Sequence, residues 1–89
     1  MLCKEMQIIN RLGLHARAAA KFVTLASEFA SDIKVKKNNK QVNGKSIMGM
    51  MMLAAAKGST IEICIDGSDE SEAMKNLEDL IDQRFGEDA

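Results

Sequence analysis

The chain has 89 residues, a formal net charge of −1 and 46% hydrophobic residues. This length predicts one domain, residues 1–89, with a single shared core. The chain has no Trp, no Tyr and only three Phe, which argues against a surface that stacks nucleic-acid bases. The longest uncharged stretch, residues 46–56, is too short to cross a bilayer, and the first residues do not form a secretory signal. We therefore expect a cytoplasmic protein that does not insert into a membrane.

Charge is unevenly distributed along the chain: residues 1–58 carry +7 and residues 59–89 carry −8. This pattern fits either a solvated surface with an acidic C-terminal helix or a basic face that recruits an acidic partner or a phosphate. Cys3 and Cys64 have no CxxC spacing, so we expect two small hydrophobic residues in a reducing compartment and no functional disulfide. With a single histidine, no metal site is expected, and no cofactor is indicated.

The first half of the chain predicts a strand, a helix and a hairpin. Alternation over residues 3–9 predicts a strand with Met6 and Ile8 on one face. A helix is predicted from 16 to 30, because apolar residues recur at three- and four-residue steps. That stripe consists of Ala19, Phe22, Val23, Ala26 and Phe29. Residues 33–42 predict a hairpin that turns at 38–39, where asparagines tolerate positive φ.

The second half predicts a short helix, a strand and a longer helix. Ser46 is a natural N-cap for a helix over 47–53, and the isoleucines of 60–66 alternate as in a strand. Asp69 and Glu72 are spaced like a capping box at the start of a last helix that Gly86 ends. The order βαββαβα then favours an α+β fold of two layers, in which helices cover one face of a four-stranded antiparallel sheet.

His15 is the only histidine, and it stands where a glycine-containing loop meets the helix that begins near Ala16. A lone histidine is often a surface or capping residue without chemistry. At an N-cap, however, the imidazole lies beside the free N–H groups of the first turn, which together with the helix dipole attract anions. Arg17 adds donors suited to phosphate oxygens. A neutral imidazole in that position is a nucleophile suited to transient phosphoryl transfer.

The string from Asn10 to Arg17, NRLGLHAR, resembles the active-site signature of the HPr family, the histidine phosphocarriers of the bacterial phosphoenolpyruvate-dependent phosphotransferase system. A second string, GKSIMG at residues 44–49, resembles the segment around that family's regulatory serine. Length, element order and the acidic last helix also fit. The resemblance implies an open-faced sandwich with strand order 1-4-2-3 and three helices on one face. That order would put Cys3 and Cys64 on the same sheet face of neighbouring strands.

The resemblance also implies roles for individual residues. His15 would accept a phosphoryl group on Nδ1 from the phosphohistidine of Enzyme I and pass it to an enzyme IIA component or a related receiver. Arg17 would stabilise the phosphoryl group, and the backbone amides of Ala16 and Arg17 would cap it. Family members from the familiar sugar systems usually carry Pro after this arginine, whereas this chain has Ala18. That departure resembles proteobacterial variants found in regulatory or incomplete phosphotransferase systems.

Ser46 has two interpretations, an ordinary N-cap or the site where an HPr kinase/phosphorylase adds a regulatory phosphate. The methionines at 48, 50, 51 and 52 are expected to lie mostly in the core. One flank of the short helix can nevertheless remain exposed and dock partners, with a charged rim that includes Arg17. The candidate docking residues are Lys45, Ile47, Met48 and Met51.

The sequence thus predicts a monomeric phosphocarrier, not an enzyme in its own right, that has no metal. Three alternatives remain open. The first is a mainly regulatory protein that docks onto others according to its phosphorylation. The second is a nucleic-acid binder that uses the basic half of the chain, against which the acidic pI of 5.8 argues. The third is a hydrolase with His15 as base, for which no second acid, base or nucleophile lies near His15 in the sequence.

Overall fold

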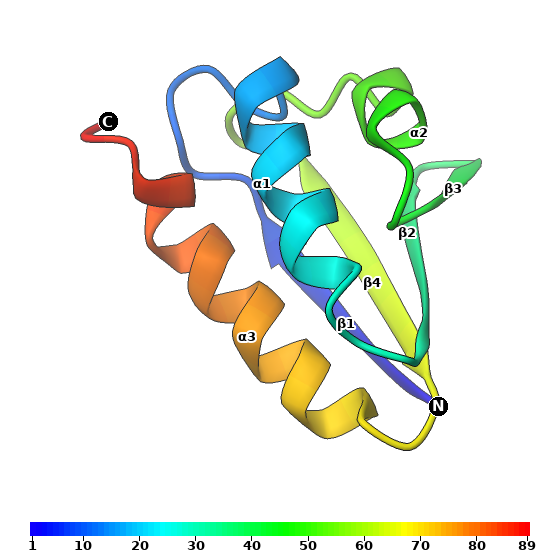
Figure 1. Cartoon of the computed structure of the whole chain (residues 1–89). Helices are drawn as coiled ribbons and strands as arrows, with labels where there is room; N and C mark the ends of the chain where they lie inside the picture. Colours follow the sequence, from blue (N-terminus) through cyan, green and yellow to red (C-terminus); the bar gives the residue numbers. More distant parts are fainter.

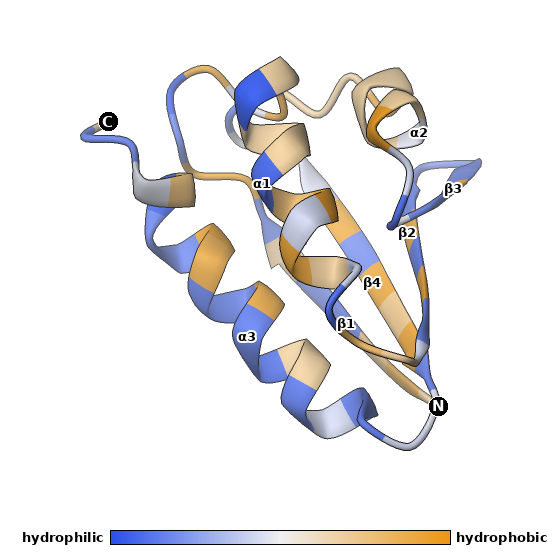
Figure 2. Cartoon of the chain, viewed as in Figure 1, coloured by the Kyte–Doolittle hydropathy of each residue, from blue (hydrophilic) through white to orange (hydrophobic).

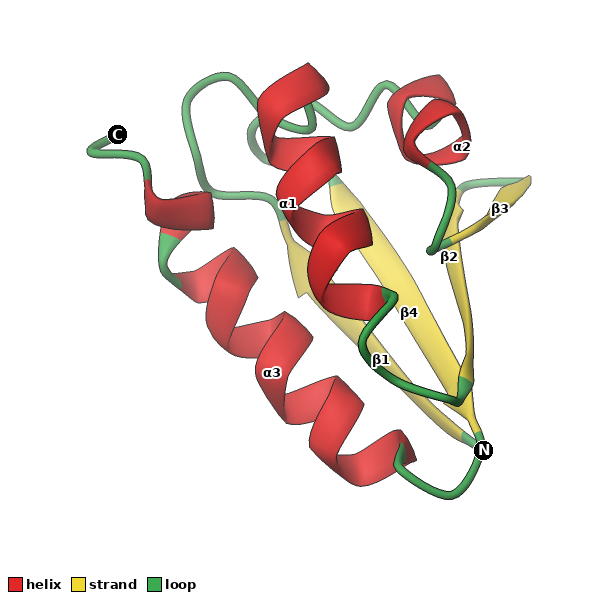
Figure 3. Ribbon diagram, viewed as in Figure 1, coloured by secondary structure: helices red, strands yellow, loops and turns green.

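The computed structural model describes residues 1–89 as a sheet with helices over one face (Figures 1 and 3). The strands are β1 (Leu2–Gln7), β2 (Asp32–Lys37), β3 (Lys40–Asn43) and β4 (Thr60–Asp66). The helices are α1 (Ala16–Ala26), α2 (Ile47–Met52) and α3 (Glu70–Asp82), followed by a 3-10 turn, η1 (Arg84–Gly86). All strand pairs are antiparallel, in the order β1-β4-β2-β3. The predicted α+β open-faced sandwich and its strand order are confirmed.

The two faces of the sheet differ in the way that the alternating sequence predicts. Ile61, Ile63 and Ile65 of β4 are buried against the helices, and so are Ile33 and Val35 of β2. Residues between them point to the other face, because successive side chains of a strand alternate. That second face carries no helix, and we call it the open face (Figure 3).

The helices turn apolar stripes toward the sheet. Buried Phe22 and Val23 on α1 and buried Leu77 and Ile81 on α3 belong to a hydrophobic cluster of 21 residues. Figure 2 shows the apolar positions of α3 recurring between polar ones. No helix of the structure is long and apolar enough to cross a membrane.

Helix α1 ends at Ala26, four residues before the predicted end. Asp69 explains why, because its carboxylate accepts hydrogen bonds from the amide of Ala30 at 2.8 Å and the amide of Ser31 at 3.0 Å, and also from the Ser31 hydroxyl. These bonds hold the chain in its turn toward β2. The predicted capping box is therefore wrong: Asp69 is the N-cap residue of α3 but makes no side-chain capping bond to that helix.

Helix α3 also ends early, at Asp82, although the apolar stripe continues to Phe85. Arg84 and Phe85 take left-handed conformations, with φ of 56° and 55°. That conformation is costly for residues other than glycine. Phe85 is 1% exposed, so burial of its ring in the core offsets the cost. The turn places the residues after it beside the loop that precedes α1, where the amide of Arg11 donates to the carbonyl of Ala89 at 3.0 Å.

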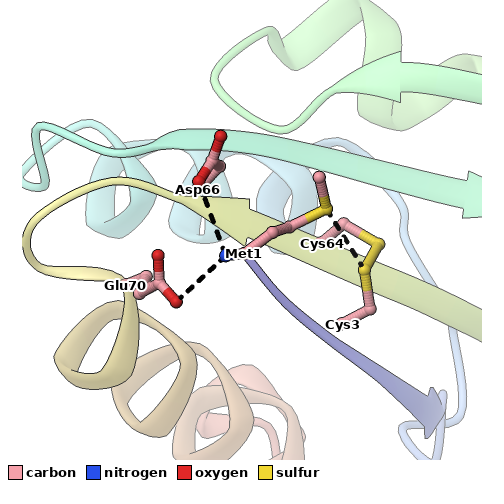
Figure 4. Close-up of a disulfide and its surroundings, with 5 residues drawn as sticks. All are labelled: Met1, Cys3, Cys64, Asp66 and Glu70. Atoms are coloured by element: carbon pink, nitrogen blue, oxygen red, sulfur yellow. Dashed lines mark hydrogen bonds and ion pairs between the residues drawn. A yellow bond between two sulfur atoms is a disulfide. The ribbon is translucent and has the colours of Figure 1, made fainter.

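Cys3 and Cys64 form a disulfide between β1 and β4 (Figure 4). Their predicted positions on one face of neighbouring strands are confirmed, since they are direct partners in the register. The prediction of two separate small hydrophobic residues is wrong. Spacing along the chain gave no sign of the bond, because the pairing of the first and last strands brings together residues 61 apart in sequence.

Candidate functional site

The loop before α1 is fixed by a close approach to the segment after α2. The amide of Leu14 donates to the carbonyl of Ala55 at 2.9 Å. Gly13 has φ of +66°, and a Cβ there would collide with the Ala55 carbonyl and lie 2.9 Å from the Cα of Ala56. Glycine is needed for both the conformation and the contact. This anchoring sets where His15 enters the helix.

His15 is the N-cap residue of α1, as predicted, with φ −71° and ψ 175°. Its side chain makes no capping bond to the helix. The first backbone bond of the helix runs from the amide of Ala19 to the carbonyl of His15, at 2.8 Å. The amides of Ala16, Arg17 and Ala18 therefore have no acceptor in the chain. A group attached to the imidazole at this position meets three free donors.

Glu87, from the chain end, contacts the imidazole of His15. The Oε2 atom of Glu87 and Nε2 of His15 form a short hydrogen bond. The two side chains keep only 16% and 27% of their surface exposed. An ionised carboxylate has no proton to donate, so Nε2 carries the hydrogen and donates it. The other ring nitrogen, Nδ1, has no hydrogen-bond partner in the chain.

Asn10 orients Glu87. The Asn10 side chain is fully buried, and its Nδ2 donates to the carbonyl of Gly13 at 2.8 Å and to Oε1 of Glu87 at 3.0 Å. Both acceptors need the amide nitrogen, and Oδ1 of Asn10 is left buried without a partner. The bond from His15, and then the one from Asn10, lower the pKa of Glu87 below its ordinary value. The carboxylate beside His15 is therefore ionised at neutral pH.

Cationic side chains surround the same place. A surface hollow of about 720 Å³ is lined by His15, Arg11, Arg17, Lys21 and the chain end 86–89. Arg17 is exposed and makes no hydrogen bond or ion pair, so its guanidinium is free to bind a ligand. Guanidinium and ammonium groups around free amides suit the oxygens of a phosphoryl group. The structure thus brings together His15, Arg17 and the amide of Ala16, as the sequence analysis expected.

The chain end is held in the hollow by two further bonds. Nζ of Lys21 donates to the carbonyl of Phe85 at 2.7 Å. The amide of Arg11 donates to the carbonyl oxygen of Ala89 at 3.0 Å. Glu87 lies between these two anchors. Its position opposite His15 is thus set by the backbone on both sides.

Ser46 caps α2, as predicted: its Oγ accepts from the amide of Gly49 at 3.1 Å. Helix α2 packs beside α1 and β3 (Figure 1). Ser46 is half-buried, and the neighbouring amide of Lys45 donates to the side chain of Asn43 at 2.9 Å. The hydroxyl of Ser46 therefore serves as the N-cap of α2.

Most of the outer surface of α2 is apolar, and Figure 2 draws this helix mainly in orange and pale tones. We define the methionine patch as the exposed side chains of Ile47, Met48, Met51 and Met52. Only Met50 is in the core, so the expectation that most of these methionines are buried is wrong. Met48 is the most exposed, at 73%.

Lys45, the fourth candidate docking residue, lies beside this patch in sequence but is engaged elsewhere. Its Nζ donates to the carbonyl of Phe29 at 2.7 Å, after the end of α1. Its ammonium group therefore stabilises the α1–β2 connection. A docking role for Lys45 stays a prediction.

Three residues of the site were missed by the sequence analysis: Asn10, Lys21 and Glu87. The acids of the last helix were interpreted as a solvated face, and Glu87 lies beyond that helix. No acid or base lies near His15 in the sequence, but Glu87 reaches the imidazole from 72 positions away. No sequence pattern marks it, because the left-handed turn at η1 alone directs it to the site.

Comparisons with known proteins agree with this geometry. Residues 2–83 match the family described as the PTS HPr component phosphorylation site. A phosphocarrier protein HPr from Neisseria meningitidis, serogroup A, is 61% identical over 87 residues, which is 98% of each chain. The match to the family model ends at residue 83, before η1, so it does not include residues 84–89.

Solved structures give the same result. The chain is 49% identical to HPr-C-His from Thermoanaerobacter tengcongensis, with a TM-score of 0.96 and full coverage of both chains. It is 45% identical to a phosphocarrier protein HPr from Bacillus anthracis, with a TM-score of 0.86 over 90% of this chain and 95% of that one. Because the family model and these relatives match nearly its whole length, the chain belongs to the HPr family of phosphocarrier proteins.

Proposed function

We propose that this protein accepts a phosphoryl group on Nδ1 of His15 from phospho-Enzyme I and passes it to enzyme IIA-type receivers. One observation carries the proposal: Glu87 occupies Nε2, while Nδ1 remains unpaired at a helix start with free amides. The imidazole is held in the tautomer whose lone pair lies on Nδ1. The protein acts in the cytoplasm as a monomeric carrier and has no turnover of its own.

Transfer proceeds by exchange of one phosphorus–nitrogen bond for another. The Nδ1 lone pair of His15 attacks phosphorus, the bond to the donor's histidine breaks, and the electron pair stays on the donor's ring. No proton has to move at His15, because Nε2 already carries one. The phosphorylated ring is cationic, and the carboxylate of Glu87 stabilises that charge. The guanidinium of Arg17 and the amides of Ala16 and Arg17 bind the transferring oxygens.

Partners dock on the surface around this site. The methionine patch provides an apolar, adaptable contact, since thioethers repack easily against different surfaces. Arg17 provides charge for acidic partners. Enzyme I and the receivers would use the same surface one after the other, with Ile47, Met48 and Met51 as anchors and Lys45 at its edge.

Ser46 is proposed as a regulatory phosphorylation site for an HPr kinase/phosphorylase. A phosphate on Oγ at the start of α2 would still accept from the first-turn amides and would be favoured by the helix dipole. It would also place about two negative charges next to the methionine patch. Docking of an acidic partner would weaken as a result.

A mainly regulatory function is the second candidate. Ala18 stands where the sugar-transporting members of the family usually carry Pro. In that case the phosphorylation state of His15 or Ser46 would control docking to other proteins, and sugar uptake would not depend on this chain.

The decisive experiment is intact-mass measurement of wild type and His15→Ala after incubation with phosphoenolpyruvate and Enzyme I, without ATP. One acid-labile phosphoryl group on wild type and none on His15→Ala is the expected result. If wild type stays unlabelled while Enzyme I is demonstrably active, the carrier function for that partner is refuted. Loss of a cellular phenotype in Ser46→Ala, with His15→Ala harmless, would favour the regulatory function.

A further inference from the structure

The disulfide between Cys3 and Cys64 lies far from His15, on the open face of the sheet. Cys3 is near the start of β1, whereas the loop that carries His15 follows the other end of that strand (Figure 1). The Cα atoms of the two cysteines are 4.0 Å apart. This spacing matches the closely spaced, non-hydrogen-bonded pairs of an antiparallel ladder, in which side chains approach most closely. The fold itself therefore places the two sulfurs together.

The pair is accessible. Cys3 is exposed and Cys64 is partly exposed, and no helix covers this face. The side chain of Met1 lies alongside, with its Sδ 3.7 Å from Sγ of Cys3 (Figure 4). Met1 is itself 75% exposed, so it does not seal the bond from solvent. An external thiolate can approach Sγ of Cys3 from the open face.

Charge around the pair favours thiolate chemistry. On the neighbouring strand β2, the exposed Lys34 is the register partner of Cys64. A nearby ammonium group stabilises a thiolate and so promotes both its release and its attack. Glu5 and Glu62 face each other two pairs further along the ladder, on the same face. Lys34 is the cation in direct register with the sulfurs.

We propose that Cys3–Cys64 is a reversible thiol–disulfide site, opened by dithiol proteins of the Cys-x-x-Cys class and closed again by disulfide oxidants. The reductant's thiolate attacks Sγ of Cys3, the Cys3–Cys64 bond breaks, and the electron pair leaves on Sγ of Cys64, which takes up a proton. The reductant's second thiolate then attacks its own sulfur in the mixed disulfide and releases Cys3, which is protonated in turn. Two electrons pass to the protein, and the reductant becomes a disulfide.

Both states fit the same fold, because the sheet holds the two residues together without the bond. The flanking pairs Lys4 with Ile63 and Leu2 with Ile65 continue the β1–β4 ladder on either side. Re-closure is therefore intramolecular and favoured by proximity. What changes is the attachment of β1, an edge strand paired only with β4. Opening the bond removes the covalent link between residues 61 positions apart and leaves β1 held by its pairing with β4 alone.

The test equilibrates full-length wild type in mixtures of oxidised and reduced dithiothreitol, then alkylates the thiols and measures intact mass. We expect monomers with either no adduct or two, in proportions that follow the mixture. A Cys-x-x-Cys reductase with its electron donor should open the bond at least about tenfold faster than a monothiol at equal concentration. His15 phosphorylation by Enzyme I should be the same in both forms, whereas the reduced form should lose roughly 10 °C in Tm.

Controls separate this proposal from a permanent crosslink or a pair of independent thiols. Cys3→Ser should take one adduct in every mixture, and Lys34→Gln should open and close more slowly than wild type. Two adducts under fully oxidising conditions would overturn the proposal, since the thiols would then not pair. A folded protein that takes no adduct even in excess reductant would overturn it as well, and so would disulfide-linked dimers as the main oxidised product.

Discussion

Glu87 and His15 are 72 residues apart in the chain, yet their side chains share a hydrogen bond at the start of α1. This contact assigns a proton to Nε2 of the imidazole and leaves Nδ1 without a partner, which supports its proposed role as the nucleophile. A carboxylate that faces an imidazole is a recurring way to fix the tautomer of a histidine. Here the carboxylate comes from the residue that follows η1.

Replacing Glu87 by Gln tests the role of its negative charge. In Glu87→Gln the side chain keeps its size, but the negative charge that stabilises the phosphorylated ring is lost. We expect phosphoryl transfer from Enzyme I to slow about tenfold or more, with little change in the unfolding midpoint. Rapid-quench kinetics measure the transfer rate. Asp82→Asn removes an exposed charge elsewhere on the last helix and should leave the rate unchanged; equal slowing in both variants would refute a specific role for Glu87.

Arg17→Ala should slow transfer by about 10²- to 10³-fold, because it removes a donor aimed at the transferring oxygens. The side chain is exposed and has no partner in the chain, so thermal melting should be unaffected. Arg17→Lys keeps the charge but lacks the planar guanidinium. Its transfer rate should therefore lie between those of wild type and Arg17→Ala. Wild-type rates in Arg17→Ala would remove this residue from the site.

Two substitutions of Ser46 separate the effect of its capping hydrogen bond on stability from the effect of a negative charge on docking. Ser46→Ala should cost about 1 kcal/mol of unfolding free energy, because the bond from the amide of Gly49 is lost. Ser46→Asp keeps an acceptor at the cap and should weaken Enzyme I binding about fivefold or more in titration calorimetry. Ser68→Asp adds the same charge before α3 and serves as the control. If Ser46→Asp binds as tightly as Ser68→Asp, charge at the α2 start does not control docking.

Gly13→Ala should destabilise the protein by about 2–4 kcal/mol in urea unfolding, because both its positive φ and the contact with residues 55–56 exclude a side chain. The same change should slow phosphorylation of His15, whose loop loses its anchor. Gly58→Ala is the matched control: φ there is +90°, but a Cβ meets nothing within 4 Å. We expect Gly58→Ala to cost only about 1–2 kcal/mol and leave transfer intact. Equal losses of unfolding free energy in the two variants would mean that the close contact at Gly13 does not contribute to stability.

Asp69 gives the protein a stability that depends on pH. The bond from the Ser31 hydroxyl, and then the amide of Ala30, lower the pKa of Asp69 from its usual 3.8 in the folded state. A folded-state pKa below the unfolded one stabilises the protein above the unfolded pKa, and this stabilisation is lost as pH falls through the folded value. The Tm difference between wild type and Asp69→Asn should therefore be full at neutral pH and shrink below about pH 4. Asp79→Asn should show no such trend; a constant gap for Asp69→Asn would contradict the assignment.

The sequence was sufficient for features set by local pattern. The alternating isoleucines of β4, the stripe on α1 and the caps at His15 and Ser46 were all predicted, because each depends on neighbours within a turn or two. The two motifs identified the family before any contact was known. His15, Arg17 and the first-turn amides followed from their position at one helix start.

Features that depend on contacts between residues far apart in the sequence could not be predicted from local patterns. The disulfide needs the register of β1 against β4, and the contact of Asp69 with the α1–β2 turn overrides a good local capping pattern. Glu87 reaches His15 only because Phe85 is buried at the cost of a left-handed backbone. Each of these contacts depends on packing between segments that are far apart in the sequence, so no local sequence pattern predicts it.

Residues 87–89 belong to the proposed phosphorylation site, because bonds from Arg11 and Lys21 hold this segment beside the imidazole. Deleting or displacing these residues would therefore disturb His15, although the sheet, the helices and the family match over residues 2–83 would remain complete. A fluorophore attached to any of these residues would lie in the same hollow as His15 and Arg17.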